Sequence, residues 1–152
     1  MRTVLSIFFL VFFSIHSDAL ASQNAVFTHQ TWDLILKRHV HPIDNGLSSQ
    51  VDYAALKRNH KDLDAYLSSL SEIKKSDFDT WPDHDQLAFL INAYNAWTVK
   101  LILKKYPDLE SIKELGSFFQ SPWKKRFIPL LGKLRSLDNI EHKLIRGSDN
   151  YN

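Results

Sequence analysis

The segment LAFLINAYNAWTVKLIL, residues 87–103, decides the fold, because it is a long helix-forming stretch with no charged residue before Lys100. Its main apolar stripe at helical spacing comprises Leu87, Leu90, Ile91, Tyr94, Trp97, Leu101 and Ile102. Further apolar residues fill much of the remaining surface. A helix that is apolar nearly all round is buried on more than one side, so we expect a central element of the core. Lys104, Lys105 and Pro107 favour its end just beyond this stretch.

Two asparagines interrupt this apolar helix. Asn92 and Asn95 lie three residues apart, and therefore about 60° apart around a helix and on one face. A buried amide without a hydrogen-bond partner costs roughly 1–3 kcal/mol, so a polar partner segment should face them. Two interpretations remain open. The amides either fasten a neighbouring loop to the helix, or they line a cleft and orient a catalytic group.

The remaining periodicity predicts three further helical regions. We expect a short helix at 31–40, one broken helix or two short ones at 51–70, and a helix at 136–147. The segment 41–50, with Pro, Asp-Asn-Gly and serines, is predicted to be a loop. Residues 74–85 form a polar connection that ends in a capping aspartate.

A small β element is expected near the C-terminal end. Apolar runs flank Gly132 within residues 125–137, which indicates a short hairpin, and Pro129 would confine the pairing to an edge. Asp138 is the predicted N-cap of the following helix, with Glu141 completing a capping box. The predicted fold class is therefore α+β, predominantly α-helical with a small β-hairpin.

The N-terminal 21 residues resemble a secretory signal peptide. Arg2 precedes an apolar run at 4–13, and Ala19-Leu20-Ala21 fits the cleavage pattern. A membrane-spanning helix needs about 20 apolar residues, so we expect cleavage after Ala21 and no stable membrane anchor afterwards. The mature part, residues 22–152, is predicted to be exported, either periplasmic or secreted.

Composition excludes several classes of function. The chain has no cysteine, which excludes disulfides, thiolate metal sites and a cysteine nucleophile within it. A net charge of +2 argues against nucleic acid as a partner, and PWKKRF at 122–127 is predicted to be a solvated rim over a packed tryptophan. His39 and His41 form an H-x-H pair but lack a third ligand, so no metal or other cofactor is expected.

Glu141 and His142 are the candidate catalytic residues. They adjoin each other and would point about 100° apart on a helix. The alternatives stay open: Glu141 serves as a capping residue, and His142 as an ordinary surface or core histidine. No recognisable nucleophile accompanies them.

Five stretches together resemble the domain of unknown function 547 family. They are VDYAALK, LAFLINAYNAWTVKLIL, YPDLESIKEL, PWKKRF and SLDNIEHKLIR, and they cover about residues 30–147. The resemblance implies that bacterial members are commonly exported. It also implies that the IEH helix is followed by a segment resembling H-F-A-L-N-C, whose histidine and cysteine would form a thiol centre like those of papain or transglutaminase folds.

The chain departs from this pattern by ending at GSDNYN. It keeps the positions matching Asn92, Asn95, Glu141 and His142 and none of the thiol positions. We therefore expect the N-terminal portion of an incomplete single domain. Three hypotheses follow: an inactive fragment of a thiol-dependent hydrolase or acyltransferase, a non-catalytic envelope module that binds a small molecule or peptide, or a truncated product without function.

Overall fold

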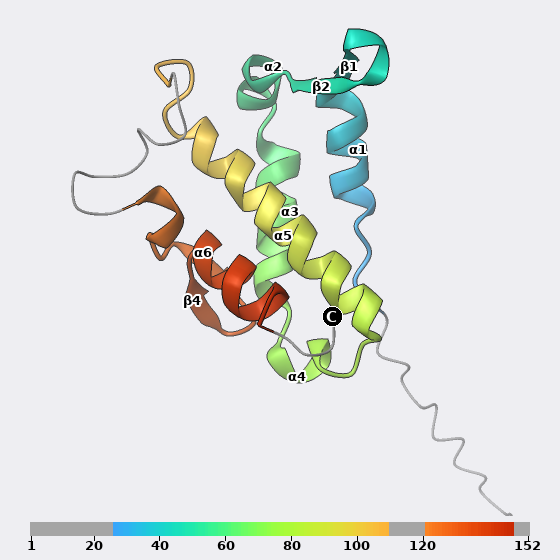
Figure 1. Cartoon of the computed structure of the whole chain (residues 1–152), viewed down its shortest axis with the longest axis vertical. Helices are drawn as coiled ribbons and strands as arrows, with labels where there is room; N and C mark the ends of the chain where they lie inside the picture. Colours follow the sequence, from blue (N-terminus) through green and yellow to red (C-terminus); the bar gives the residue numbers. More distant parts are fainter. Residues whose placement is uncertain (1–25, 110–120, 148–152) are drawn as a thin grey trace, which may run out of the picture.

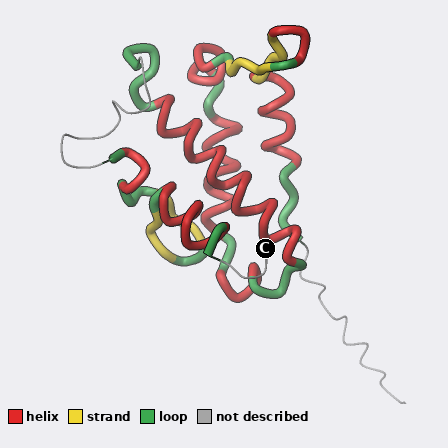
Figure 2. Tube along the Cα trace, viewed as in Figure 1, coloured by secondary structure: helices red, strands yellow, loops and turns green. Residues whose placement is uncertain are grey.

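The computed structural model describes residues 26–109 and 121–147, which form a helical body with two small strand pairs (Figures 1 and 2). The first half contains α1 (Gln30–His39), β1 (Val40–Ile43), η1 (Asp44–Gly46), β2 (Ser48–Val51), α2 (Tyr53–Arg58), α3 (Lys61–Glu72) and α4 (Lys75–Phe78). The second half contains α5 (Asp83–Leu103), η3 (Pro122–Lys124), β3 (Ile128–Leu130), β4 (Lys133–Arg135), α6 (Leu137–Asn139) and η4 (Ile140–Ile145). The predicted α+β class is confirmed.

The longest helix, α5, crosses the middle of the molecule (Figure 1). It packs against α3, which in turn contacts α1, while α6 and η4 cover another side of α5. The predicted break within residues 51–70 is confirmed, because α2 ends at Arg58 and α3 begins at Lys61. No helix in the described part of the chain is long and apolar enough to cross a membrane.

An aromatic cluster around Phe89 forms the centre of the core. The Phe89 ring is fully buried, and its centroid lies 5.4 Å from that of Phe27, 5.6 Å from Phe78 and 5.4 Å from Trp81. Phe78 and Trp81 belong to the segment that the sequence predicted as a polar connection. Their burial explains why two large aromatic residues interrupt it, since both pack against Phe89 in the N-terminal half of α5.

The buried face of α5 differs from the predicted stripe. The buried residues of this helix are Gln86, Phe89, Leu90, Ala93, Ala96, Leu101 and Leu103. Ile91, which the prediction placed in the stripe, is 42% exposed. The helix is therefore buried along one face and exposed along another.

The predicted aspartate cap is also wrong: Pro82 is the N-cap residue, and Asp83 and Asp85 lie in the first turn.

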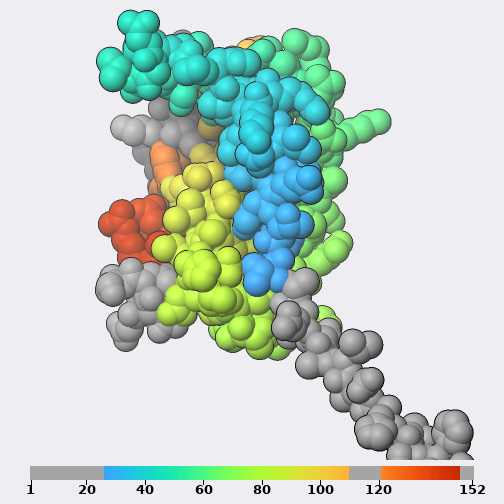
Figure 3. All heavy atoms as spheres, turned by 90° about the vertical axis from the view of Figure 1, so that its right-hand side faces the viewer, coloured from blue at the N-terminus to red at the C-terminus, as the bar shows by residue number. Residues whose placement is uncertain are grey.

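Residues 41–50 form a hairpin and not the predicted loop. β1 pairs antiparallel with β2, from Val40 opposite Val51 to Ile43 opposite Ser48. Asp44 and Asn45 both adopt positive φ, at 51° and 56°, which closes the turn. The hairpin projects beyond the helices, and Leu47 next to its turn is 90% exposed (Figures 1 and 3).

The predicted hairpin around Gly132 is confirmed. β3 pairs with β4, with Pro129 opposite Leu134, and both turn residues Leu131 and Gly132 have positive φ. The buried Arg135 joins this hairpin to α6, because its Nε donates to the Leu130 carbonyl at 3.0 Å and its Nη1 to Asn139 Oδ1 at 2.9 Å. These bonds fix where the final helical segment begins.

His29 makes the core sensitive to acid. Its Nδ1 accepts the Tyr66 hydroxyl hydrogen bond at 2.6 Å, and burial lowers the pKa of His29 below its ordinary 6.5, although the nearby Asp85 carboxylate opposes the shift. The unfolded chain therefore takes up a proton near pH 6.5, whereas the folded chain does so only at lower pH. The contribution of His29 to the free energy of unfolding is expected to be constant above that pH and to fall as the pH drops from about 6.5 toward the folded pKa.

Urea denaturation at pH values from 7.5 to 4.5 measures this effect. His29→Gln keeps an acceptor for Tyr66 and should flatten the decline. The control variant His84→Gln should retain it, because the His84 side chain is 81% exposed. A His29→Gln profile as steep as that of the wild type would contradict the assignment.

Candidate functional site

The candidate site lies where η4 packs against α5. The structure places Ser136 and not Asp138 at the start of the final helix: the Ser136 backbone is extended, and its Oγ accepts from the Asn139 amide at 3.1 Å. The predicted capping box of Asp138 and Glu141 is therefore wrong, because the helix begins two residues earlier. Glu141 therefore does not cap the helix. Its side chain lies against Tyr94 of α5.

The segment carrying Glu141 is a π-helical turn. The Arg146 amide donates to the Glu141 carbonyl, five residues earlier, at 2.9 Å. Single π turns widen a helix and occur often at functional sites. Here the wider turn belongs to the element that carries both candidate catalytic residues, Glu141 and His142.

Tyr94 connects three segments through its hydroxyl group. Trp123, carried by η3, donates its indole N–H to the Tyr94 oxygen, and the Tyr94 hydroxyl donates to the Glu141 carboxylate. Burial raises the pKa of Tyr94, and the negative charge of Glu141 raises it further. The phenol therefore stays protonated at neutral pH and remains a donor to the carboxylate.

An open cleft of about 220 Å³ lies beside this contact. It is lined by Ile91, Tyr94, Glu141 and Ile145, so a carboxylate borders a mainly apolar surface. Glu141 Oε1 also pairs with Arg146 Nη2 at 2.9 Å, at the outer edge where the Arg146 side chain is 68% exposed. An ionised carboxylate has about four lone-pair sites. Tyr94 and Arg146 occupy two of them, which leaves acceptor capacity for a ligand.

His142 does not line this cleft. Its imidazole is half exposed, and its Nε2 lies 4.0 Å from Asp138 Oδ1, one turn away on the outer surface. The structure thus separates the adjacent residues Glu141 and His142 into a cleft-lining carboxylate and a surface imidazole. A catalytic role for His142 stays a prediction.

The two central asparagines are not a buried pair. Asn95 is exposed and Asn92 is half-buried, and both lie away from the buried face of α5. The premise of two buried amides was wrong, because the described elements that pack against α5 leave Asn95 exposed and cover Asn92 only in part. A role in orienting a catalytic group stays a prediction for both residues.

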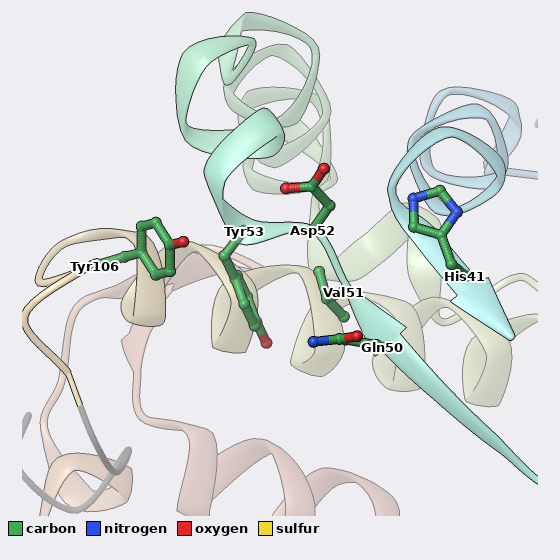
Figure 4. Close-up of a pocket in the computed structure, with 6 residues that line it drawn as sticks. All are labelled: His41, Gln50, Val51, Asp52, Tyr53 and Tyr106. Atoms are coloured by element: carbon green, nitrogen blue, oxygen red, sulfur yellow. The ribbon is translucent and has the colours of Figure 1, made fainter. Parts of the chain in front are cut away.

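A second pocket, of about 390 Å³, lies beside the β1–β2 hairpin (Figure 4). It is lined by His41, Gln50, Val51, Asp52, Tyr53 and Tyr106. The Asp52 carboxylate already accepts from the Ala55 amide at 2.8 Å and caps α2, so its role here is structural. The centroids of the Tyr53 and Tyr106 rings lie 6.0 Å apart, and the ring planes are tilted by 36°.

The H-x-H pair is divided between two environments. α1 ends at the buried His39, whereas His41 is exposed on β1. Among the described residues, no three histidine, aspartate or glutamate side chains are grouped as metal ligands would be.

The PWKKRF prediction is confirmed, since Lys124, Lys125 and Arg126 are exposed around the half-buried Trp123.

Sequence reasoning missed the role of Tyr94. Because it lies within an apolar stripe, it was interpreted as a core residue, although its phenol oxygen contacts both Trp123 and Glu141. The partners Trp123 and Glu141 are distant in the chain, so no local spacing pattern joins the three residues.

Tyr94→Phe is expected to lower the free energy of unfolding by about 1–2 kcal/mol, because it leaves the Trp123 N–H and the Glu141 carboxylate each short of one partner. Chemical denaturation of both proteins measures the difference. The matched control is Tyr106→Phe, which should change stability by less than about 0.5 kcal/mol. Equal effects of the two substitutions would contradict the connecting role of Tyr94.

Comparison with known proteins identifies one family. The family model described as "Protein of unknown function, DUF547" matches residues 78–152. No curated protein and no solved structure matches the chain. The match contains four of the five stretches that carried the resemblance. VDYAALK, at 51–57, lies outside it, so the N-terminal part of the resemblance stays a prediction.

Proposed function

Since residues 78–152 match the family model described as "Protein of unknown function, DUF547", we propose that this chain is a non-catalytic binding module of the cell envelope. Its ligand is a short peptide or peptide-like small molecule that carries an amino group beside an apolar side chain. The ligand binds in the cleft between α5 and η4. The observation that supports this proposal is the Glu141 carboxylate, held by Tyr94 at the edge of an apolar cleft with acceptor sites left over.

The chemistry of the cleft favours such a ligand. Ile91 and Ile145 offer apolar surface to a side chain, and Glu141 offers acceptors to an ammonium group. Arg146, paired with Glu141 and largely exposed, can turn toward a ligand carboxylate. A dipeptide zwitterion with apolar side chains therefore matches the cleft: its ammonium group suits the Glu141 carboxylate, its side chains suit the apolar surface, and its carboxylate suits Arg146.

Nuclear magnetic resonance with L-leucyl-L-leucine tests the proposal. We expect saturable shifts at residues 91–95 and 140–146, and at least tenfold weaker binding by Glu141→Gln. This variant keeps an acceptor for Tyr94 but removes the charge. Glu72→Gln, on the exposed end of α3, is the matched control and should bind as the wild type does. Shifts spread evenly over the surface, or equal affinities of the two variants, would contradict the proposal.

A second candidate is part of a thiol-dependent hydrolase or acyltransferase. It is favoured by the uncovered face of α5, where Ile91 is 42% exposed and Asn95 is exposed in mid-helix. Such a face would receive a segment that supplies histidine and cysteine. Sequencing the source DNA beyond the codon for Asn152 tests this. A frame that continues into a histidine- and cysteine-containing stretch supports the enzyme, and a stop codon refutes it.

We further propose that the protein is exported, because Arg2, the apolar run at 4–13 and Ala19-Leu20-Ala21 form a signal-peptide pattern. Fractionation of a Gram-negative host that expresses the full chain with a C-terminal tag tests this proposal. The expected product is outside the cytoplasm and begins at Ser22. Uncleaved protein confined to the cytoplasm would contradict it.

A further inference from the structure

A group of basic side chains surrounds a small pocket between α2, the start of α3 and the end of α5, and none of its lining residues lines the proposed ligand cleft. The pocket has a volume of about 140 Å³ and is lined by Lys57, His60, Lys100, Leu103 and Lys104. Three lysines and a histidine thus converge around one apolar residue.

One carboxylate partly neutralises this group. Asp64 Oδ1 accepts from Lys100 Nζ at 2.5 Å, and its Oδ2 lies 2.8 Å from His60 Nδ1. Burial alone would raise the pKa of Asp64, but the hydrogen bonds from Lys100 and His60 hold it below its ordinary value. Asp64 is therefore a fixed negative charge that pairs with both Lys100 and His60.

The other two lysines have uncharged partners. Lys57 Nζ donates to the Tyr106 carbonyl, and Lys104 Nζ lies 4.8 Å from the centre of the Phe127 ring. Burial lowers the pKa of Lys104, and the charges of Lys125 and Lys100 lower it further. An approaching anion would relieve this repulsion, because it would be attracted by several cations at once.

Backbone donors add to the positive charge. His60 is the N-cap residue of α3, and no side chain caps this helix. The first amides of α3 therefore lack a side-chain acceptor, and the N-terminus of this twelve-residue helix, next to the pocket residue His60, favours an anion. The C-terminus of α5 carries a partial negative charge, which would repel an anion. Lys104 and Lys100 lie at this end and offset that charge.

The size of the pocket limits the ligand. A water molecule occupies about 30 Å³ of liquid, so the pocket has the volume of about four or five waters. This volume suits a tetrahedral oxyanion with a few atoms attached to it. Leu103 is almost fully buried beneath the lysines and offers an apolar floor to those atoms.

From this arrangement we propose that the pocket formed by Lys57, His60, Lys100, Leu103 and Lys104 binds the phosphate group of a small soluble molecule. Lys104 and Lys57 contact the phosphate oxygens directly. Asp64 competes with the ligand for Lys100 and limits the affinity. The site is separate from the α5–η4 cleft, so it could exist whether or not that cleft binds a peptide.

Titration with inorganic phosphate at constant ionic strength, with chloride as the balancing anion, tests the proposal. Backbone amide shifts of the full mature chain should saturate at residues 57–62 and 100–105. Lys104→Gln should weaken phosphate binding at least tenfold, because it removes one contacting charge. Asp64→Asn should strengthen binding at least threefold, because it removes the competing carboxylate.

Two matched substitutions on other parts of the surface control for net charge. Lys133→Gln on β4 and Asp79→Asn beyond α4 should each change the affinity less than twofold. Circular dichroism verifies that each variant is folded. Lys104→Gln keeps the test valid if Asp64→Asn is unstable, since the Lys104 side chain is exposed. Shifts that do not saturate, or equal losses in Lys104→Gln and Lys133→Gln, would overturn the proposal.

Discussion

Phe89→Ala is expected to lower the free energy of unfolding by about 3–5 kcal/mol, which is the range for deleting a large aromatic side chain from a core. Phe89 is fully buried and lies within 5.6 Å, centroid to centroid, of three aromatic rings from different parts of the chain. The surrounding rings are rigid, so they can fill the resulting cavity only in part. Because whole domains are stable by about 5–15 kcal/mol, this single change should unfold a large share of the protein at moderate urea concentrations.

Urea denaturation followed by tryptophan fluorescence measures the effect. Leu134→Ala is the control, since Leu134 is 56% exposed on the β3–β4 hairpin and should contribute little. Phe89→Leu should fall between the two, because it retains most of the apolar volume. A loss below about 1 kcal/mol for Phe89→Ala would contradict the placement of this ring at the centre of the core.

Arg135→Ala is expected to lower the free energy of unfolding by about 3 kcal/mol. The substitution removes both donors and leaves the buried Leu130 carbonyl and the partly buried Asn139 oxygen without those partners. Burial lowers the pKa of Arg135, and its hydrogen-bond partners, the Leu130 carbonyl and Asn139 Oδ1, are neutral oxygens. Its contribution therefore comes from hydrogen bonds and packing, and not from an ion pair.

The same substitution should also weaken ligand binding, because Arg135 fixes the start of the segment that carries Glu141. Arg135→Lys keeps the charge but cannot reach both acceptors, so its stability should be intermediate. Arg126→Ala, at an exposed position, is the control and should have little effect. Denaturation midpoints compare the variants. Equal stability of Arg135→Ala and Arg126→Ala would show that the buried guanidinium does not join the hairpin to α6.

Local sequence patterns predicted the helices and strands whose conformation depends on residues close together in the chain. The helix at 83–103 has long apolar periodicity, and the β3–β4 hairpin has Gly132 in a turn that needs positive φ. The β1–β2 hairpin was missed because Val-His-Pro-Ile and Ser-Ser-Gln-Val lack apolar alternation. The Asp-Asn-Gly turn was the available indication, since this composition favours tight hairpins.

The site was less predictable, because long-range contacts form it. Glu141 was identified as a polar residue of interest, but its assignment to a capping box depended on Asp138, and Ser136 caps the helix instead. Tyr94 and Trp123 reach Glu141 from other segments of the chain. The exposure of Asn95 likewise depends on which elements pack against α5, and periodicity alone cannot show that.

The affinity of wild type and Glu141→Gln for L-leucyl-L-leucine and for its N-acetyl derivative tests the central claim most directly. Acetylation removes the ammonium group and keeps the apolar side chains. If Glu141 binds that group, acetylation should weaken wild-type binding at least tenfold and change binding by Glu141→Gln less than twofold. Calorimetry provides the four affinities. An equal loss in both proteins, or no binding of the dipeptide to the wild type, would contradict the assignment of the α5–η4 cleft as an amine-binding site.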